Sequence, residues 1–352
     1  MIKCSLPRKT SSNSTVVKRQ FKMATRWGIA GAGLISADFV TALEELKDHK
    51  VVAVAARSLE RAQEFGKKYG VEKTYSSYEE LSKDPDIDVV YVGVIHPHHL
   101  SVSSMMIRAG KPVLCEKPLC MNVKETKQLV DLAREKKVFL MEAVWSRYLP
   151  VYKEMMKRIK SGELGEIIQV IASFGQPIGH VDRITKKSLG GGSTLDIGIY
   201  CVQFASLVMG GEKPVKVVGG GHLNSEGIDE TTSATLVYSN GRVATLMCSL
   251  RCALPCEGVV VGTKGTLKVN YPMWSSESLE SPSGKFESLL PKGRTFNFVN
   301  SQGLMYEAME VRECLKKGLL ESSSMSLDET LILAEIMEAM RKQVGVSYSQ
   351  DS

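Results

Sequence analysis

The feature that most constrains this chain is a glycine pair placed directly after a short, largely apolar run. Residues 27–30 lead straight into Gly31-Ala32-Gly33. Glycines at such a turn let the backbone approach a pyrophosphate, and a helix that begins there points its positive N-terminus at that anion. Ser36 stands where a third glycine is usual, and its small side chain still permits close packing of the helix. The sequence therefore predicts a strand, turn and helix that bind a dinucleotide. The residues expected at the phosphates are Gly31, Gly33, Leu34 and Ile35.

The end of a second apolar run, at residues 51–56, indicates which dinucleotide binds. This run ends on Arg57 and Ser58. An acidic residue at that point would bind the 2′-hydroxyl of the adenosine ribose, whereas Arg57 and Ser58 offer a charge and a hydroxyl to a 2′-phosphate. The sequence thus predicts NADP(H) rather than NAD(H). For the glycine pair taken alone, an ordinary tight turn is the alternative.

The charge distribution and the composition exclude several classes of partner. The chain has 352 residues, 43% hydrophobic and 24% charged, which suits a globular protein with room for two domains. Its net charge of +6 comes from residues 1–22, which carry six basic residues and no acidic one, so 39 basic and 39 acidic residues remain elsewhere. A neutral body predicts no nucleic-acid partner, and no run approaches the ~20 apolar residues of a membrane span.

Residues 1–22 form a basic, serine-rich leader without the apolar core of a secretory signal. A disordered extension, or a second start at Met23, is favoured over mitochondrial import. The eight cysteines form no C-x-x-C pair. This pattern predicts reduced thiols, a cytoplasmic location and no structural metal.

Two kinds of sheet are expected along the chain. From Trp27 to Met141, apolar runs alternate with helical patterns, which is typical of a doubly wound parallel sheet. Beyond Pro150, successive strand patterns joined by turns such as Asn240-Gly241 and Lys264-Gly265 predict an open, mainly antiparallel sheet. The fold class is therefore α/β, with an N-terminal Rossmann domain and a C-terminal α+β domain. The expected divisions are a leader (1–22), a cofactor domain (23–145), a substrate-binding and dimerisation domain (146–345) and a tail (346–352).

Local signals predict where several elements begin and end. Ser58 and Gly70 bound one helix, and capping boxes at 77–80 and 326–329 open two more, the second ending at Gly345. Residues 275–303 are rich in serine, proline and glycine, and are expected to loop over one edge of the second sheet. The strands expected there are residues 166–174, 215–219, 231–238, 242–250 and 258–269.

Three residues are candidates for the chemistry. Lys117, within Glu116-Lys117-Pro118, follows a predicted strand at the edge where a nicotinamide ring would lie. Asp196 and Tyr200 follow a glycine turn and are four apart, which places them on one helical face. Tyr200 can act as a base near neutral pH only if a cation such as Lys117 lowers its pKa from ~10. The alternatives are a solvated lysine, a helix cap and a packed tyrosine.

Further candidates surround these three. His96 and His98 flank a proline without a ligand partner, so His96 is placed beside the nicotinamide ribose rather than at a metal. Tyr91 lies in an apolar strand and is either near the cofactor or part of the core. The residues expected to line an apolar substrate pocket are Trp145, Arg147, Phe174, His180 and Trp274.

The motifs in combination resemble the glucose-fructose oxidoreductase (Gfo/Idh/MocA) family of NAD(P)-dependent dehydrogenases. The matching segments are Gly31-x-Gly33, residues 110–118 and residues 190–200, and the resemblance covers nearly all of residues 23–345. It implies a Rossmann domain, an open sheet that commonly forms a homodimer interface, and a lysine of Glu-Lys-Pro at the active site. It also implies cofactor contacts for Tyr91, His99, Lys117 and Asp196, and an alcohol contact for Tyr200.

Many members of the family have histidine at the position of Tyr200. A tyrosine at this position resembles those members that oxidise trans-dihydrodiols of benzene and naphthalene to catechols, and D-xylose to its lactone. Our hypothesis is direct hydride transfer from a substrate C–H to the nicotinamide of NADP, with Tyr200 as general base. Lys117 poises Tyr200, Asp196 orients Lys117 or the substrate, and Arg57 holds the 2′-phosphate. Two alternatives remain open. One is a dehydrogenase of another sugar or inositol, and the other is a non-catalytic NADP(H) sensor.

Overall fold

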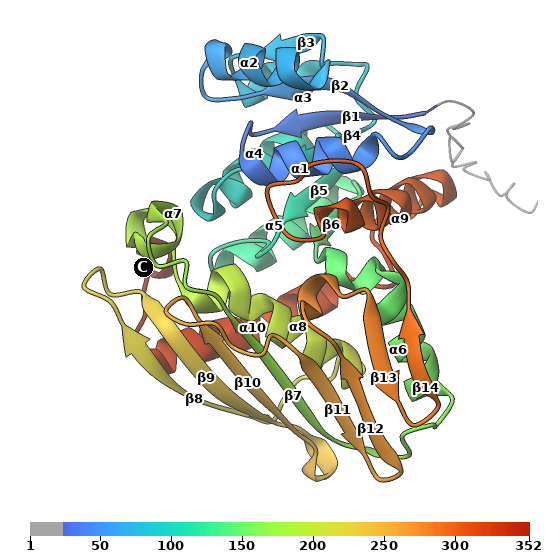
Figure 1. Cartoon of the computed structure of the whole chain (residues 1–352). Coiled ribbons are helices and arrows are strands. Elements are labelled where there is room, and N and C mark those ends of the chain that lie inside the picture. Colours follow the sequence, from blue (N-terminus) through green and yellow to red (C-terminus); the bar gives the residue numbers. More distant parts are fainter. Residues whose placement is uncertain (1–23) are drawn as a thin grey trace, which may run out of the picture.

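A six-stranded parallel sheet forms the first part of the computed structural model, which describes residues 24–352 (Figure 1). The strand order is β3-β2-β1-β4-β5-β6, and every neighbouring pair is parallel. The strands are β1 (Thr25–Ala30), β2 (His49–Ala55), β3 (Lys73–Tyr75), β4 (Val89–Val92), β5 (Val113–Glu116) and β6 (Leu140–Ala143). The helices between them are α1 (Leu34–Leu43), α2 (Leu59–Tyr69), α3 (Tyr78–Lys83), α4 (His99–Arg108) and α5 (Val123–Lys136). The predicted Rossmann sheet is confirmed.

The helix boundaries follow from short-range signals. The Ser58 hydroxyl accepts a hydrogen bond from the Arg61 N–H at 3.4 Å and so begins α2, which ends where Gly70 takes a left-handed conformation, with φ of 66°. Ser326 begins α10 (Leu327–Val344) in the same way, and Gly345 ends it. These side chains satisfy N–H groups that an isolated helix leaves without partners.

An eight-stranded sheet with the order β14-β13-β12-β11-β7-β10-β9-β8 forms the second layer. Its strands are β7 (Ile167–Gly175), β8 (Lys216–Leu223), β9 (Asp229–Val237), β10 (Val243–Ser249), β11 (Gly258–Gly262), β12 (Gly265–Val269), β13 (Ser278–Ser281) and β14 (Gly284–Glu287). The β10/β7 pair is parallel and the other neighbouring pairs are antiparallel. Helices α6 (Pro150–Lys160), α8 (Ile199–Val208) and α10 pack on one face of this sheet, as Figure 1 shows.

The segment at 275–303 differs from the expected loop. Residues 278–287 form the β13–β14 hairpin at the sheet edge, and the chain then crosses over α1 (Figure 1). Asp38 of α1 is 1% exposed and accepts hydrogen bonds from the N–H groups of Asn297 and Phe298 at 2.8 and 2.9 Å. The segment therefore straps the first helix of the parallel sheet to the second sheet.

The C-terminal helices and the last residues contact elements from earlier in the chain. Helix α9 (Leu304–Lys317) packs on α1 and on the 3-10 turn η2 (Trp145–Tyr148). Arg341 of α10 is fully buried and contacts both carboxylate oxygens of Asp351 at 2.6 Å. The Tyr348 hydroxyl donates to the Gly191 carbonyl at 2.5 Å, so the last residues support the glycine turn.

Short turns complete the described part of the chain. They are η1 (His96–His98), α7 (Asp182–Thr185), η3 (Lys187–Leu189), the π-type turn η4 (Thr194–Gly198), η5 (Ser239–Gly241), η6 (Met273–Ser275), η7 (Ser301–Gly303) and η8 (Ser349–Asp351). The predicted leader at 1–22 lies outside the described residues. Among the helices of residues 24–352, none has both the length and the apolar character to cross a membrane.

Candidate active site

The glycine turn after β1 has the geometry of a phosphate cradle. Gly31 has a φ of 107°, and a Cβ added there would lie 2.8 Å from the carbonyl oxygen of Gly93. Gly33 begins α1 without a side-chain cap, so the first N–H groups of the helix are left for a ligand. Ser36 is fully buried, and a Cβ on Gly93 would collide with its hydroxyl. Gly93 thus supplies the room that the missing third glycine would have given.

The end of β2 carries two cations. Arg57 is exposed directly after the strand, and Arg61 lies one turn into α2. Burial raises the pKa of Tyr78, while the charges of Arg57 and Arg61 oppose that rise, so both cations lie near this phenol. This end of the sheet can therefore hold an anionic group attached to a ribose.

The three predicted catalytic residues meet at the end of β5. The Lys117 ammonium donates to the main-chain carbonyl of Asp196 at 2.6 Å and lies 3.9 Å from the Asp196 carboxylate. It also lies 5.1 Å from the centre of the Tyr200 ring. The peptide bond between Lys117 and Pro118 is cis. An amine that follows β5, a carboxylate of η4 and a phenol of α8 thus lie close together.

Arg183 of α7 completes the charge arrangement around Asp196. Its guanidinium donates to the Asp196 carboxylate at 2.7 Å, and the imidazole of His96 lies 3.9 Å from the same oxygen. Burial alone would raise the pKa of Asp196, but the charges of Lys117 and Arg183 outweigh burial and hold that pKa well below its usual value. Sequence reasoning missed Arg183. The only signal available was a charged pair, Asp182-Arg183, shortly before the glycine turn.

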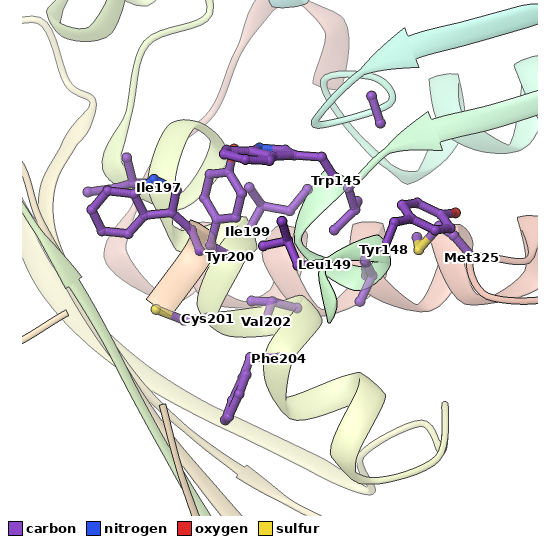
Figure 2. Packing of buried hydrophobic residues seen from close by; sticks show 14 of the residues in the cluster. Trp145, Tyr148, Leu149, Ile197, Ile199, Tyr200, Cys201, Val202, Phe204 and Met325 are labelled. Carbon is purple, nitrogen blue, oxygen red and sulfur yellow. The ribbon is translucent and has the colours of Figure 1, made fainter. Parts of the chain in front are cut away.

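Tyr200 is buried between aromatic side chains. Trp145 donates its indole N–H to the Tyr200 hydroxyl at 2.9 Å, and Figure 2 shows the indole lying across the phenol end. The ring of Phe174 lies 5.6 Å from that of Tyr200 and stacks on Trp274 at 3.9 Å. Burial, and then the charge of Glu116, raise the pKa of Tyr200 well above its usual value. The expected lowering of this pKa by Lys117 is not found, so the phenol is protonated near neutral pH.

A second buried polar group lies behind Lys117. The Tyr91 hydroxyl donates to one carboxylate oxygen of Glu116 at 2.5 Å, and the main-chain N–H of Lys117 donates to the other oxygen at 3.2 Å. The Tyr91 ring stacks on Phe39 at 4.0 Å. Glu307 of α9 is fully buried near Glu116, and neither of its carboxyl oxygens has a hydrogen-bond partner among the described residues. The sequence offered no signal for Glu307, which is one of several acidic residues in a helical pattern.

The two buried histidines fix backbone segments. The His96 ring lies 3.0 Å from the Gly190 carbonyl, and burial lowers the pKa of His96 well below its usual value. The His99 ring nitrogens lie 2.8 Å from the Pro118 carbonyl and 3.0 Å from the Val94 carbonyl, and burial lowers the pKa of His99 as well. Both rings therefore hold the loops that follow β4 and β5 at the site.

Two predicted pocket residues are placed elsewhere. The Arg147 side chain is 1% exposed and contacts the Glu329 carboxylate at 2.7 Å, the Gln203 side chain and two carbonyls. Its charge is neutralised in the core, so the prediction that Arg147 faces the substrate is wrong. His180 is exposed on the loop between β7 and α7.

Residues 24–352 contain no group of three His, Cys, Asp or Glu side chains that could hold a metal.

Comparison with known proteins assigns the family. The model of the GFO/IDH/MocA oxidoreductase family with an NAD-binding Rossmann fold matches residues 25–144, and that of the GFO/IDH/MocA C-terminal domain matches residues 152–268. The chain belongs to the GFO/IDH/MocA oxidoreductase family. It is therefore an NAD(P)-dependent dehydrogenase, as the resemblance of its motifs implied.

Individual relatives agree with this assignment. The chain is 49% identical over 333 residues to trans-1,2-dihydrobenzene-1,2-diol dehydrogenase of Danio rerio, covering 94% of this chain and 100% of the relative. The Bos taurus protein of the same name is 45% identical, and the match covers 94% of this chain and 99% of the relative. Among solved structures, a 3-ketoreductase from Actinomadura kijaniata with NADP and TDP-benzene has a TM-score of 0.77 at 25% identity, covering 91% of this chain and 98% of that one. The structure of levoglucosan dehydrogenase has a TM-score of 0.79 at 19% identity, covering 91% of this chain and 97% of that one. At this low identity the likeness supports only the fold.

The ion pair of Arg183 and Asp196 predicts a pH-dependent effect on stability. Removing one member of a buried pair costs about 3–5 kcal/mol, and because the Arg183 side chain is 38% exposed we expect about 1–2 kcal/mol for Arg183→Gln at pH 7. The low pKa of Asp196 stabilises the fold above the ordinary aspartate pKa, and this contribution is lost as the pH falls through the lowered value. The difference in the free energy of unfolding between the wild type and Arg183→Gln should therefore shrink below about pH 4. Urea unfolding from pH 3 to pH 8 measures it, with Lys186→Gln directly after the same helix as control. A constant difference across this range would contradict the assignment.

Proposed function

We propose that the protein is an NADP-dependent dehydrogenase that oxidises trans-dihydrodiols of aromatic rings to catechols, and that also accepts D-xylose. The observation that carries the proposal is the meeting of Lys117, Asp196 and Tyr200 beside aromatic walls. Phe174 and Trp274 offer flat apolar surfaces to a ring, while Lys117 and Asp196 offer polar contacts to hydroxyl groups. The names of the relatives from Danio rerio and Bos taurus support the same substrate.

The residues present fit a bound NADP. Gly31, Gly33 and the first turn of α1 would hold the pyrophosphate, because these positions combine close backbone approach with helix N–H groups that lack a cap. Arg57, with Arg61 and Ser58, would hold the 2′-phosphate. Tyr91, His96, His99 and Glu116 line or support the edge where the nicotinamide would lie.

In the proposed reaction, the oxidised nicotinamide would accept a hydride from the substrate carbon that bears the hydroxyl group. In oxidation of the alcohol, Tyr200 first loses its proton to solvent, and its phenolate oxygen then takes the hydroxyl proton. In the reverse direction the phenol donates its proton to the carbonyl oxygen, and the Trp145 N–H holds the phenol oxygen in place. Lys117 donates to the substrate oxygen, and Asp196 fixes Lys117 through its carbonyl and its charge. Because the pKa of Tyr200 is raised, the phenol is a ready proton donor for carbonyl reduction near neutral pH, whereas alcohol oxidation speeds up as the pH rises.

Replacement of Tyr200 tests the proton-transfer role. We expect Tyr200→Phe to lower kcat for dihydrodiol oxidation by about 10²–10⁴-fold and to change the Kd of NADPH less than about twofold, because only the hydroxyl is removed. The rise of kcat with pH above pH 8 should also disappear. Initial rates of NADP⁺ reduction across pH 6–10 and NADPH fluorescence titration measure both effects.

Tyr238→Phe is the matched control, because Tyr238 is also buried but lies between β9 and the turn η5, outside the site. Wild-type rates in Tyr200→Phe would refute the role of the phenol. NADP⁺ reduction with D-xylose but with no aromatic diol would instead favour a sugar dehydrogenase, and binding of NADPH without turnover of either substrate would favour a sensor.

The cofactor preference depends on Arg57. A hydrogen bond to a charged group contributes about 1.5–3 kcal/mol, so Arg57→Gln should weaken NADP⁺ binding about 10–100-fold. NAD⁺ binding should change little, because NAD⁺ has no 2′-phosphate. Calorimetry with both nucleotides measures the change, and Arg108→Gln on α4 is the charge-matched control. Equal weakening of both nucleotides would show that Arg57 acts on the fold rather than on the phosphate.

We also propose a homodimer through the face of the second sheet that faces away from α8 and α10. Five strands there present a row in register, formed by Val218, Thr235, Thr245, Ile171 and Val259. All five are uncharged, β-branched and at least partly exposed, which suits a surface that a second copy covers. The cytoplasm remains the proposed location, supported by seven described cysteines that are free thiols.

A charge in the middle of this row tests the homodimer. Because Ile171 lies on the central strand β7, we expect Ile171→Lys to convert a dimer into a folded monomer, while Leu289→Lys beyond the sheet leaves the dimer intact. Light scattering after gel filtration gives the mass, and circular dichroism confirms folding. A wild-type chain that is monomeric at micromolar concentration would overturn this proposal.

A further inference from the structure

Glu307 is a buried carboxyl group that the proposed reaction does not use. It lies one turn into α9 and is fully buried, and neither of its oxygens has a hydrogen-bond partner among the described residues. A carboxylate without partners in such a place costs several kcal/mol, so the group carries a proton. Burial, and then the charge of Glu116, raise the pKa of Glu307 well above its usual value.

Glu116 is the charged member of this carboxyl pair. Its two oxygens accept hydrogen bonds from the Tyr91 hydroxyl and the main-chain N–H of Lys117, and the charge of Lys117 favours its ionised form. Two buried carboxyl groups that act on each other cannot both be ionised without a compensating cation. The pair therefore holds one negative charge and one proton.

The charges around the site balance without a ligand. Lys117 and Arg183 are the cations, and Asp196 and Glu116 are the anions. Burial raises the pKa of Glu116, but the charge of Lys117 and two hydrogen bonds oppose this rise and favour the ionised form. His96 and His99 are neutral because burial lowers the pKa of each. The titratable groups that face Glu307 from the surrounding elements are Tyr91 of β4, Glu116 of β5, Tyr148 of η2 and Tyr200 of α8. Because burial raises the pKa of each of these tyrosines, Glu307 is the group in this set that is best placed to lose a proton.

We propose that Glu307 is a charge-compensating acid, which releases its proton when the oxidised, positively charged form of the cofactor binds and regains it with the reduced, neutral form. The inference rests on the proposed function, because it takes the cofactor ring to lie at the end of β5. One extra positive charge in a balanced, buried site favours ionisation of the nearest neutral acid. The proton passes from the Glu307 carboxyl to bulk buffer, and no bond to the cofactor is made.

This arrangement makes the ratio of the Kd values of the oxidised and reduced cofactor depend on pH. If binding of the oxidised form releases a proton, its Kd falls as the pH rises, by at most about tenfold per pH unit for one proton. The Kd of the reduced form lacks this contribution. Both forms carry the same 2′-phosphate, so the titration of that phosphate cancels when the two are compared.

Calorimetric titration of the full chain with NADP⁺ and with NADPH, at pH 7.5 in buffers of different ionisation enthalpy, counts the protons released by each. We expect NADP⁺ to release more protons than NADPH in the wild type and in Glu313→Gln, an exposed substitution on the same helix. In Glu307→Gln the two counts should be equal, because the neutral amide has no proton to lose. NADPH binding to Glu307→Gln shows that the variant is folded at the site.

A second measurement needs no variant. The infrared difference spectrum of the wild type should show loss of a protonated-carboxyl band when NADP⁺ is added and no such loss with NADPH. Equal proton counts for the two nucleotides in the wild type, or a difference that persists in Glu307→Gln, would overturn the inference. Failure of the wild type to bind either nucleotide would instead refute the proposed function.

Discussion

The Asp196 carboxylate is the interaction on which the site depends, because it joins segments that are distant along the chain. It contacts Arg183 of α7 and lies 3.9 Å from the Lys117 ammonium at the end of β5 and 3.9 Å from the neutral imidazole of His96 in η1. An aspartate buried to this extent is stable as an anion only because two cations face it. Lys117 follows a strand of the parallel sheet, whereas Asp196 and Arg183 come from the second part of the chain. The site therefore forms only when both parts are folded together.

The late part of the sequence secures this meeting. Asp38 binds the segment that crosses α1, and Tyr348, held by the Arg341–Asp351 pair, supports the glycine turn before Asp196. The Asp38 and Tyr348 contacts satisfy buried polar groups on α1 and on the glycine turn. The chain therefore uses its C-terminal residues to fix the position of a pocket whose reactive groups come from residues 117–200.

Much of the fold could be predicted because its signals are local. Ser58, Gly70, Ser326 and Gly345 mark helix ends through bonds or conformations within a few residues, and the glycine pair marks the first turn. The long-range partners could not be predicted. Nothing near Arg147 in the sequence indicates a core ion pair with Glu329, and nothing near Arg183 or Glu307 indicates a site residue. Their roles arise from packing between elements that are distant along the chain.

The raised pKa values of Tyr200 and Glu307 have one cause and favour the same direction of the proposed reaction. Burial keeps both groups neutral, and the charge of Glu116 strengthens the effect on each. A neutral phenol is suited to donating a proton to a carbonyl, which favours reduction. A neutral acid that ionises beside a cationic ring stabilises the bound oxidised cofactor, and this also favours reduction of the carbonyl, because that reaction regenerates the oxidised cofactor. Glu116 thus acts on one equilibrium through both groups, and the pH shifts this equilibrium because oxidation of the alcohol releases one proton overall.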